Sequence, residues 1–341
     1  MNFSEMDGDT RRILIDTTQV YEAFLQTLED ARRYRGGMRW KKTAGKDYLF
    51  RTWGRRGYGR GLGPRSPETE EIFAQFHGGK KAIEQRKDAL QKQIVRQARF
   101  CIATGVNRVP KITANIIRLL DNAGVMGHGL TILGTNAIFA YEVACGVLAR
   151  SSLLATGDID LLFDSRAKLR MVGQIDTAGL IGILRKVDRS FEIQARGHFR
   201  AVNQAGFVVE MVKPVPIPPQ KIERQTLSGA SDDLVAAEME GFLWLQNAPK
   251  FVRIAISEDG FPVRMHVPDP RFFALNKLWV GELSSRNPLK RSRDREQAEM
   301  VIQLAEGYLN LSFDDPALRV FPQKIRNRIN QTRPPRQTSP R

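Results

Sequence analysis

The stretch Gly157-Asp158-Ile159-Asp160-Leu161-Leu162-Phe163 decides the fold that the sequence predicts. Alternate side chains of a β-strand share a face. Asp158 and Asp160 are therefore expected to project together, while the apolar residues around them point into a core. Two carboxylates held side by side repel each other, which is hard to explain as packing. We interpret the pair as a site for one or two hard divalent cations, which bind through oxygen.

A small-residue turn precedes this strand. Gly134, Thr135 and Asn136 follow a short apolar strand expected at residues 130–133 and open a helix expected to run to about residue 148. A glycine that leads into a helix N-terminus lets a phosphate approach the backbone N–H groups and the positive end of the helix dipole. The turn is therefore predicted to bind phosphate.

A third acid is expected on a neighbouring strand. Glu210 interrupts the apolar run 207–212, and a carboxylate in a buried strand needs a partner such as a metal ion. Glu192 is the competing candidate, but the residues around it are less apolar. The sequence therefore favours Asp158, Asp160 and Glu210 as the catalytic and metal-binding acids.

The order of these features resembles the nucleotidyltransferase superfamily that includes DNA polymerase β and the minimal nucleotidyltransferases. Later residues are similar to the helical half of AbiEii-type nucleotidyltransferases and of bacterial nucleotidyltransferase-fold proteins of undefined function. These residues are the segment 272–278 with Lys277, then Arg286, Lys290, and the run that begins Arg293-Asp294. The resemblance covers about residues 111–310.

The resemblance implies an α+β fold with the mixed sheet of polymerase β and flanking helices. An N-terminal helix and β-hairpin region and a C-terminal helical region would be added to it. It also implies that the three acids hold Mg²⁺, with Mn²⁺ as an alternative, and that the turn and its helix take the triphosphate of an NTP such as ATP.

The resemblance further implies that Lys277, Arg293 and Asp294 line the nucleotide site. Lys277 would neutralise phosphate charge, and Asp294 would orient a basic neighbour or the target. The residues themselves leave plainer alternatives open. Lys277 and Lys290 can be solvated helix charges, and Arg293-Asp294 can be an ordinary pair at a helix start.

The net charge of +16 is concentrated in two places. Residues 31–65 hold twelve Lys and Arg against the single acid Asp47, and residues 322–341 hold six Lys and Arg and no acid. Aromatic residues interleave the first segment, which suits phosphate contacts combined with base stacking. The predicted nucleic-acid contacts are Arg51, Arg55, Arg56 and Arg60. Alternatively, the rings pack on a core and the arginines are simply solvated.

The composition is that of a globular protein, with 42% hydrophobic and 26% charged residues. Cys101 and Cys145 give no disulfide framework. The polar, acidic start shows no secretory signal, so a cytoplasmic protein without a membrane partner is expected. Four segments are predicted: an N-terminal helical region with a basic hairpin at 1–110, a catalytic domain at 111–220, a C-terminal hairpin and helical domain at 221–320, and a basic disordered tail at 321–341.

The leading functional prediction is Mg²⁺-dependent transfer of a nucleoside monophosphate from an NTP to an acceptor hydroxyl, with release of pyrophosphate. The charge distribution favours a nucleic acid acceptor such as tRNA. Two alternatives remain. In the first, the chain keeps the fold as a catalytically inactive nucleic-acid-binding protein. In the second, it is the toxin of a toxin–antitoxin pair and has a small antitoxin partner.

Overall fold

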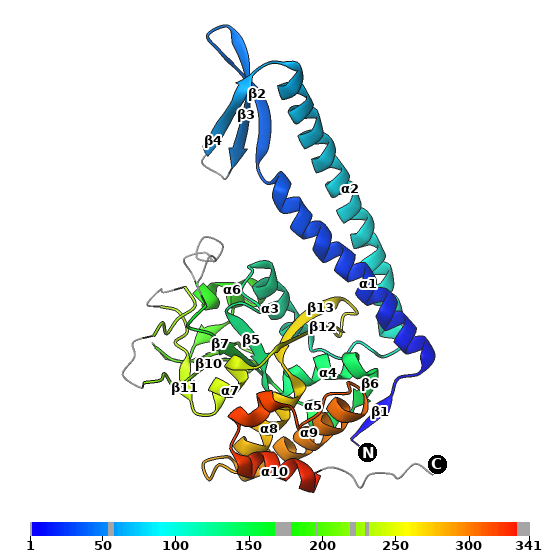
Figure 1. Cartoon of the computed structure of the whole chain (residues 1–341), viewed down its shortest axis with the longest axis vertical. Coiled ribbons are helices and arrows are strands. Elements are labelled where there is room, and N and C mark those ends of the chain that lie inside the picture. Colours follow the sequence, from blue (N-terminus) through cyan, green and yellow to red (C-terminus); the bar gives the residue numbers. More distant parts are fainter. Residues whose placement is uncertain are drawn as a thin grey trace. The chain divides into compact units, whose positions relative to one another are not determined.

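The computed structural model describes residues 2–53, 58–167, 179–195, 197–218, 223–228 and 232–332. The chain divides into two compact units (Figure 1). The first, here called the α/β unit, comprises Met1–Arg11, Gly105–Asp259 and Val263–Arg341. The second, here called the helix–sheet unit, comprises Arg12–Thr104 and Gly260–Pro262.

A mixed β-sheet forms the centre of the α/β unit. Its strands follow the order β5-β7-β10-β9-β8, and β11 also pairs with β10. The pairs β7–β10 and β10–β11 are parallel, whereas β5–β7, β10–β9 and β8–β9 are antiparallel. The strands are β5 (Leu130–Leu133), β7 (Asp158–Phe163), β8 (Glu192–Ile193), β9 (Arg200–Val202), β10 (Val208–Pro214) and β11 (Ala237–Met239). This is the predicted α+β class with a mixed sheet.

Helices and two small strand pairs surround the sheet. The helices are α3 (Lys111–Asn122), η2 (Gly134–Ala137), α4 (Ile138–Cys145), α5 (Ser151–Leu154), α6 (Gly179–Val187), α7 (Phe242–Asn247), α8 (Pro270–Val280), α9 (Pro288–Gly307), η3 (Pro316–Val320) and α10 (Gln323–Thr332). The strand pairs are β1 (Phe3–Glu5) with β6 (Val147–Ala149), and β12 (Lys250–Ile256) with β13 (Pro262–Pro268).

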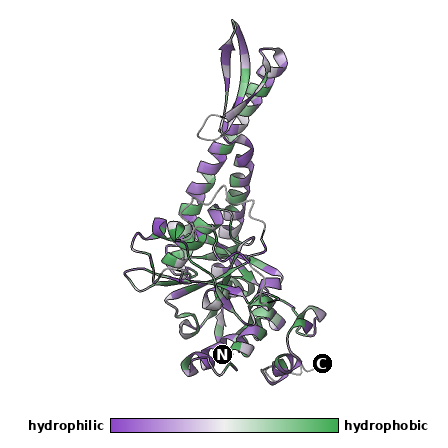
Figure 2. Ribbon diagram, turned by 90° about the vertical axis from the view of Figure 1, so that its left-hand side faces the viewer, coloured by the Kyte–Doolittle hydropathy of each residue, from purple (hydrophilic) through white to green (hydrophobic). Residues whose placement is uncertain are grey.

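One hydrophobic core runs through the α/β unit. It joins buried side chains of the sheet, such as Ile159 and Met211, to those of the C-terminal helices, such as Leu304 and Ile325. Figure 2 shows hydrophobic residues gathered on the elements in the middle of this unit. The division therefore differs from the predicted segments 111–220 and 221–320, because the C-terminal helices share the core of the sheet.

Three further predictions differ from the structure. The sequence also predicts a helix near 231–246, but this segment contains β11 and α7 instead, because residues 237–239 pair with β10 and Gly241 has a φ of +76°. The N-terminal residues predicted with the hairpin region belong instead to the α/β unit, where β1 pairs with β6. The predicted disordered tail begins too early, because Ile325 and Ile329, one helical turn apart, are buried on α10.

The helix–sheet unit consists of two long helices and a three-stranded antiparallel sheet. Its elements are α1 (Gly8–Ala31), η1 (Arg32–Tyr34), β2 (Gly37–Thr43), β3 (Lys46–Trp53), β4 (Tyr58–Pro64) and α2 (Pro67–Ala103). The sequence predicts the hairpin and, after it, a glycine-rich basic loop that ends at Pro67. The structure has the hairpin as β2–β3, but residues 58–64 of the expected loop form β4. Ser66 caps α2 in a capping box with Thr69, and Pro67 occupies the first turn.

A small core holds the sheet to α2. Met38, Leu49 and Phe76 are buried together, and Tyr34, Trp40 and Phe73 pack against them. None of the described helices combines the length and the apolar composition needed to cross a lipid bilayer.

We expect Leu49→Ala to lower the free energy of unfolding of the helix–sheet unit by about 2–5 kcal/mol, because it leaves a cavity in this small core. Leu62→Ala is the control, since Leu62 is 36% exposed on β4, and its expected cost is below about 1 kcal/mol. Hydrogen exchange of the β2 and β3 amides measures the difference. Equal losses for the two variants would contradict the packing described here.

Candidate active site

The pairing of two parallel strands gathers the three predicted acids. Asp158 and Asp160 alternate with buried residues on β7. In the register of β7 with β10, Glu210 pairs with Asp160, and Val208 pairs with Asp158. Directly paired residues lie on the same face of a sheet, so Glu210 lies on the face of the two aspartates. Glu192, the competing candidate, lies exposed on β8, which β9 separates from β10.

Asp160 lies at the centre of this group. Burial, and after it the negative charges of Asp158 and Glu210, raise the pKa of its carboxyl to about 6, although Lys277 and Lys290 act in the opposite direction. The group therefore combines crowded negative charge with two nearby cations. Such crowding at partly buried carboxyls is typical of functional sites.

The turn after β5 lies against Asp160. Gly134 has a φ of +61°, and a Cβ atom at this position would overlap Asp160 Oδ2. Leu133 at the end of β5 pairs with Asp160. Glycine is therefore required here both for its backbone conformation and for the close approach to the carboxylate.

The two residues after Gly134 are buried and hydrogen-bonded. Asn136 Nδ2 donates to the backbone oxygen of Asp158 (2.8 Å), and Asn136 Oδ1 is buried without a hydrogen-bond partner among the described residues. Gln297 Nε2 on α9 donates to Thr135 Oγ1 (3.1 Å) and to the oxygen of Leu153 (2.7 Å). Gln297 was not predicted, because nothing in its local sequence shows that α9 reaches the turn.

The predicted residues of the helical half meet around one buried carboxylate. Asp294 on α9 is fully buried; it accepts hydrogen bonds from Lys277 Nζ (2.7 Å) and Arg286 Nε (2.6 Å). Burial lowers the pKa of the Lys277 ammonium, while Asp294 and, more weakly, Asp160 raise it. Lys277 is therefore within electrostatic reach of both Asp294 and Asp160. The alternative that Lys277 is a solvated helix charge is therefore wrong. Asp294 holds two basic neighbours, Lys277 and Arg286.

Two of the predicted site residues, Arg293 and Glu210, form hydrogen bonds with other parts of the chain. Arg293 Nη1 donates to the oxygen of Ala155 (2.9 Å), just before β7. Glu210 Oε1 accepts a hydrogen bond from Arg200 Nε on β9 (2.7 Å). Within the part of the chain that the structure describes, no group of three or more His, Cys, Asp or Glu side chains is arranged to hold a metal ion. Glu210 thus shares a face with the aspartates while its carboxylate pairs with Arg200.

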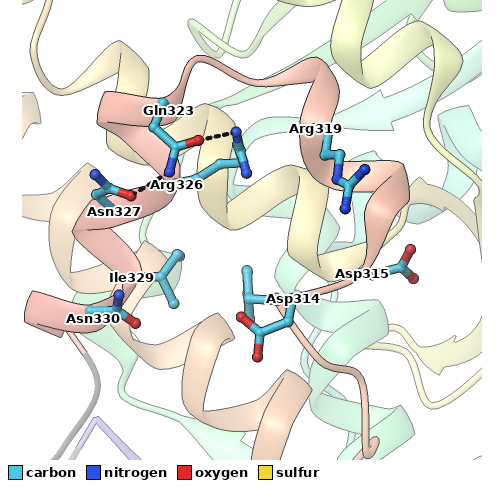
Figure 3. Close-up of a pocket in the computed structure, with 9 residues that line it drawn as sticks. Asp314, Asp315, Arg319, Gln323, Arg326, Asn327, Ile329 and Asn330 are labelled. Carbon is cyan, nitrogen blue, oxygen red and sulfur yellow. Dashed lines mark hydrogen bonds between the residues drawn. The ribbon is translucent and has the colours of Figure 1, made fainter.

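Two shallow cavities lie near the C-terminal helices. One, of about 360 Å³, borders Lys277 and is strongly basic; its lining residues are Lys277, Leu278, Gly281, Glu282, Arg291, Arg295 and Arg328. The other, of about 290 Å³, lies between η3 and α10 and is shown in Figure 3. The side chains drawn there, among them Asp314, Arg319 and Gln323, include none of the predicted site residues.

Comparison with known proteins identifies the family of the chain. Residues 111–321 match the model of a protein family described as nucleotidyltransferase. The match covers more than half of the chain. The chain belongs to this nucleotidyltransferase family. Searches of curated proteins and of solved structures each found no significant match. The matched region spans the sheet, the turn, and α8 and α9, so the described acids and the Lys277 cluster all fall within it.

The four arginines predicted to contact nucleic acid are not equivalent in the structure. Arg51 packs inward: its guanidinium lies 4.0 Å from the centre of the Phe76 ring, and Nη2 donates to the oxygen of Arg33 (3.0 Å). Burial lowers the pKa of Arg51. Arg60 is exposed on β4 opposite Arg51. Arg55 and Arg56 lie outside the described residues. Arg51 thus follows the packing alternative.

We expect Gly134→Ala to destabilise the α/β unit by about 2–5 kcal/mol, because it combines an unfavourable φ with overlap of the new Cβ and the Asp160 carboxylate. Gly206→Ala is the matched control, since Gly206 has a φ of +79° and open space around it; its expected cost is about 1–2 kcal/mol. Urea unfolding measures both. An equal cost for the two would show that the approach to Asp160 is not close.

The pH dependence of stability provides a second test, carried out in EDTA. Because the pKa of Asp160 is raised in the folded state to about 6, the parent should lose stability on ionisation of this group as the pH rises from about 4 through 6. Asp160→Asn removes that loss and should be more stable than the parent at pH 7.5, on the order of 1–3 kcal/mol.

The comparison is between variant and parent, because burial also raises the pKa of Glu142, to about 7. Glu192→Gln, which removes an exposed carboxylate from the same sheet, should keep the pH dependence of the parent. A parallel pH dependence for Asp160→Asn and the parent would contradict the raised pKa.

Proposed function

We propose that the protein catalyses transfer of a nucleoside monophosphate from an NTP to an acceptor hydroxyl. In this reaction the acceptor hydroxyl loses its proton to solvent and its oxygen forms a bond to the α-phosphorus. The bond from that phosphorus to the bridging oxygen breaks, and pyrophosphate leaves. The single observation that carries the proposal is the β7–β10 register, which sets Glu210 beside Asp160 on the face of Asp158. Membership of the nucleotidyltransferase family supports it.

The donor set suits a divalent cation of the Mg²⁺ type. Asp158 and Asp160 offer carboxylate oxygens on one face. Asn136, whose Nδ2 donates to the backbone oxygen of Asp158, offers a third hard oxygen, since its Oδ1 has no hydrogen-bond partner among the described residues. Glu210 would join after exchanging its hydrogen bond with Arg200 for the ion. When bound there, Mg²⁺ supplies positive charge against the phosphates of the NTP.

The residues of this chain would bind and orient the triphosphate from two sides. Gly134 brings the backbone of the turn against the site without a side chain, which allows close approach of a phosphate. Lys277, held by Asp294, supplies a fixed cation toward Asp160. Because burial and these hydrogen bonds fix the groups before the NTP arrives, little reorganisation is needed in the reaction.

The proposed acceptor is a nucleic acid such as tRNA. The support for it is the basic charge of residues 31–65 in the helix–sheet unit. One observation favours the inactive, nucleic-acid-binding alternative: the carboxylate of Glu210 is paired with Arg200 rather than turned to a shared site. The toxin alternative, with its small antitoxin partner, is supported only by the resemblance of the helical half.

The test is incorporation of radiolabelled NMP from each of the four NTPs into cellular RNA with Mg²⁺, together with pyrophosphate release. We expect the double variant Asp158→Asn/Asp160→Asn to reduce incorporation by about a hundredfold or more, since removing charge stabilisation of this kind costs several kcal/mol. Glu192→Gln is the control and should retain the activity of the parent.

Two outcomes would contradict the proposal. Undiminished incorporation by the double variant would remove the aspartates from the chemistry. Binding of NTP by the parent without incorporation into any RNA, or into protein or small-molecule hydroxyls, would favour the inactive reading.

A further inference from the structure

The two faces of the β2–β3–β4 sheet differ in what covers them. In the register of β2 with β3, Met38 pairs with Arg51 and Trp40 with Leu49, and these residues make the face toward α2. Trp40 packs on Phe73 with ring centres 5.8 Å apart, and Arg51 lies over Phe76. In Figure 1, α2 runs beside the sheet, and none of the other helices and strands described for this unit lies on the opposite side.

That opposite side, here called the outer face, carries a regular set of side chains. Arg39 pairs with Phe50, and Lys41 pairs with Tyr48, while Lys46 pairs with Thr43 at the hairpin end. Because paired residues share a face, two aromatic rings of β3 lie beside basic side chains. The Nζ atom of Lys41 lies 5.7 Å from the centre of the Phe50 ring.

The cations of the outer face are not neutralised. Among the described residues, no carboxylate forms an ion pair with Arg39, Lys41 or Lys46. The only acid of the hairpin, Asp47, pairs across the strands with Lys42 on the other face and forms an ion pair with Arg65. The outer face therefore presents positive charge without an internal partner.

The edge strand leaves the side of the Phe50 ring uncovered. Gly61 pairs with Phe50 and Gly59 pairs with Thr52, so β4 contributes no side chain beside Phe50 on this face, whereas Pro64 pairs with Tyr48. A Cβ atom at Gly61 would stand 3.7 Å from the Phe50 ring, in ordinary contact with it. Glycine at this position keeps the side of Phe50 open to a planar group.

We infer that the outer face binds a single-stranded nucleic acid, with bases stacked on Phe50 and Tyr48 and phosphates held by Arg39, Lys41 and Lys46. Half-buried rings among cations that no described carboxylate neutralises match a strand that offers both base faces and phosphates. The bases of a duplex are already stacked on one another and cannot lie flat on these rings. The inference deepens the proposed function, on which it rests for the role of the strand as acceptor.

The test measures binding of the full chain to a fluorescein-labelled RNA single strand of roughly 12 nucleotides, within the site sizes of known single-strand binders. EDTA is present and NTP is absent, so binding is measured apart from transfer. We expect Phe50→Ala to weaken binding about fivefold or more, because stacking of a base is lost. Phe50→Leu keeps apolar bulk without the aromatic face and should weaken binding similarly if Phe50→Ala is poorly folded.

The charge contribution is tested by salt dependence. Arg39→Gln/Lys41→Gln/Lys46→Gln should reduce the slope of log K against log salt by about two, at about 0.7 per phosphate contact on a single strand. Lys81→Gln/Arg86→Gln/Lys92→Gln is the matched control, since it removes three exposed charges from α2 and should leave the slope unchanged. Phe100→Ala, at an α2 ring that is 48% exposed, is the control for loss of a phenylalanine.

Several results would overturn the inference. The first three are unchanged RNA binding by the outer-face variants, an equal effect of the α2 control on binding, and tighter binding of the matching duplex. The fourth is displacement of the RNA strand by polyglutamate at equal charge, together with unchanged RNA binding by Phe50→Ala, which would indicate an acidic protein as the partner. Binding as expected without NMP transfer would support the inference and refute the proposed function. Transfer without single-strand binding would do the reverse.

Discussion

Repulsion between carboxylates at one end of β7 is the constraint on which the rest of the α/β unit depends. The alternation of a strand sets Asp158 and Asp160 on one face, and the parallel pairing with β10 adds Glu210. Burial makes the charge of Asp160 still more costly. The surroundings relieve part of this cost through nearby cations, including Lys277, and through the Arg200 partner of Glu210. Like charges held this close destabilise the folded protein. Such clusters are typical of sites that bind a cation or a phosphate-bearing ligand.

Asp294 links this charge group to the helical half of the unit. It is fully buried, and its two oxygens hold Lys277 of α8 and Arg286 of the segment before α9. A buried ion pair adds little net stability, whereas loss of one partner leaves a buried charge unpaired. Its value therefore lies in position: the carboxylate fixes the ammonium of Lys277 near Asp160. Gln297, one turn further along α9, donates a hydrogen bond to Thr135. This bond connects α9 to the turn after β5.

Local patterns predicted the centre of the site, and long-range pairing determined what they missed. The alternation around Asp158 and the apolar run 130–133 identified β7 and β5 closely. Glu210 could be chosen over Glu192 because its flanking run is more apolar. By contrast, β11 exists only through its pairing with β10, and β4 pairs with β3 despite three glycines that disfavour a strand. The hydrogen bond of Gln297 to the turn joins residues 162 positions apart in sequence, and no local signal contains it.

The basic segment shows why a count of charges cannot assign a binding surface. Arg39 and Arg51 lie on neighbouring strands of one hairpin and are alike in composition, yet the register places them on opposite faces. Arg51 packs on the Phe76 ring, where burial lowers the pKa of its guanidinium. Arg39 lies beside the Phe50 ring on the outer face. The same holds for the aromatic residues, since Trp40 fills the core under α2 and Tyr48 does not. Packing therefore accounts for the face toward α2, and the recognition of nucleic acid that we propose belongs to the outer face. The period of two along the strands separates the two faces.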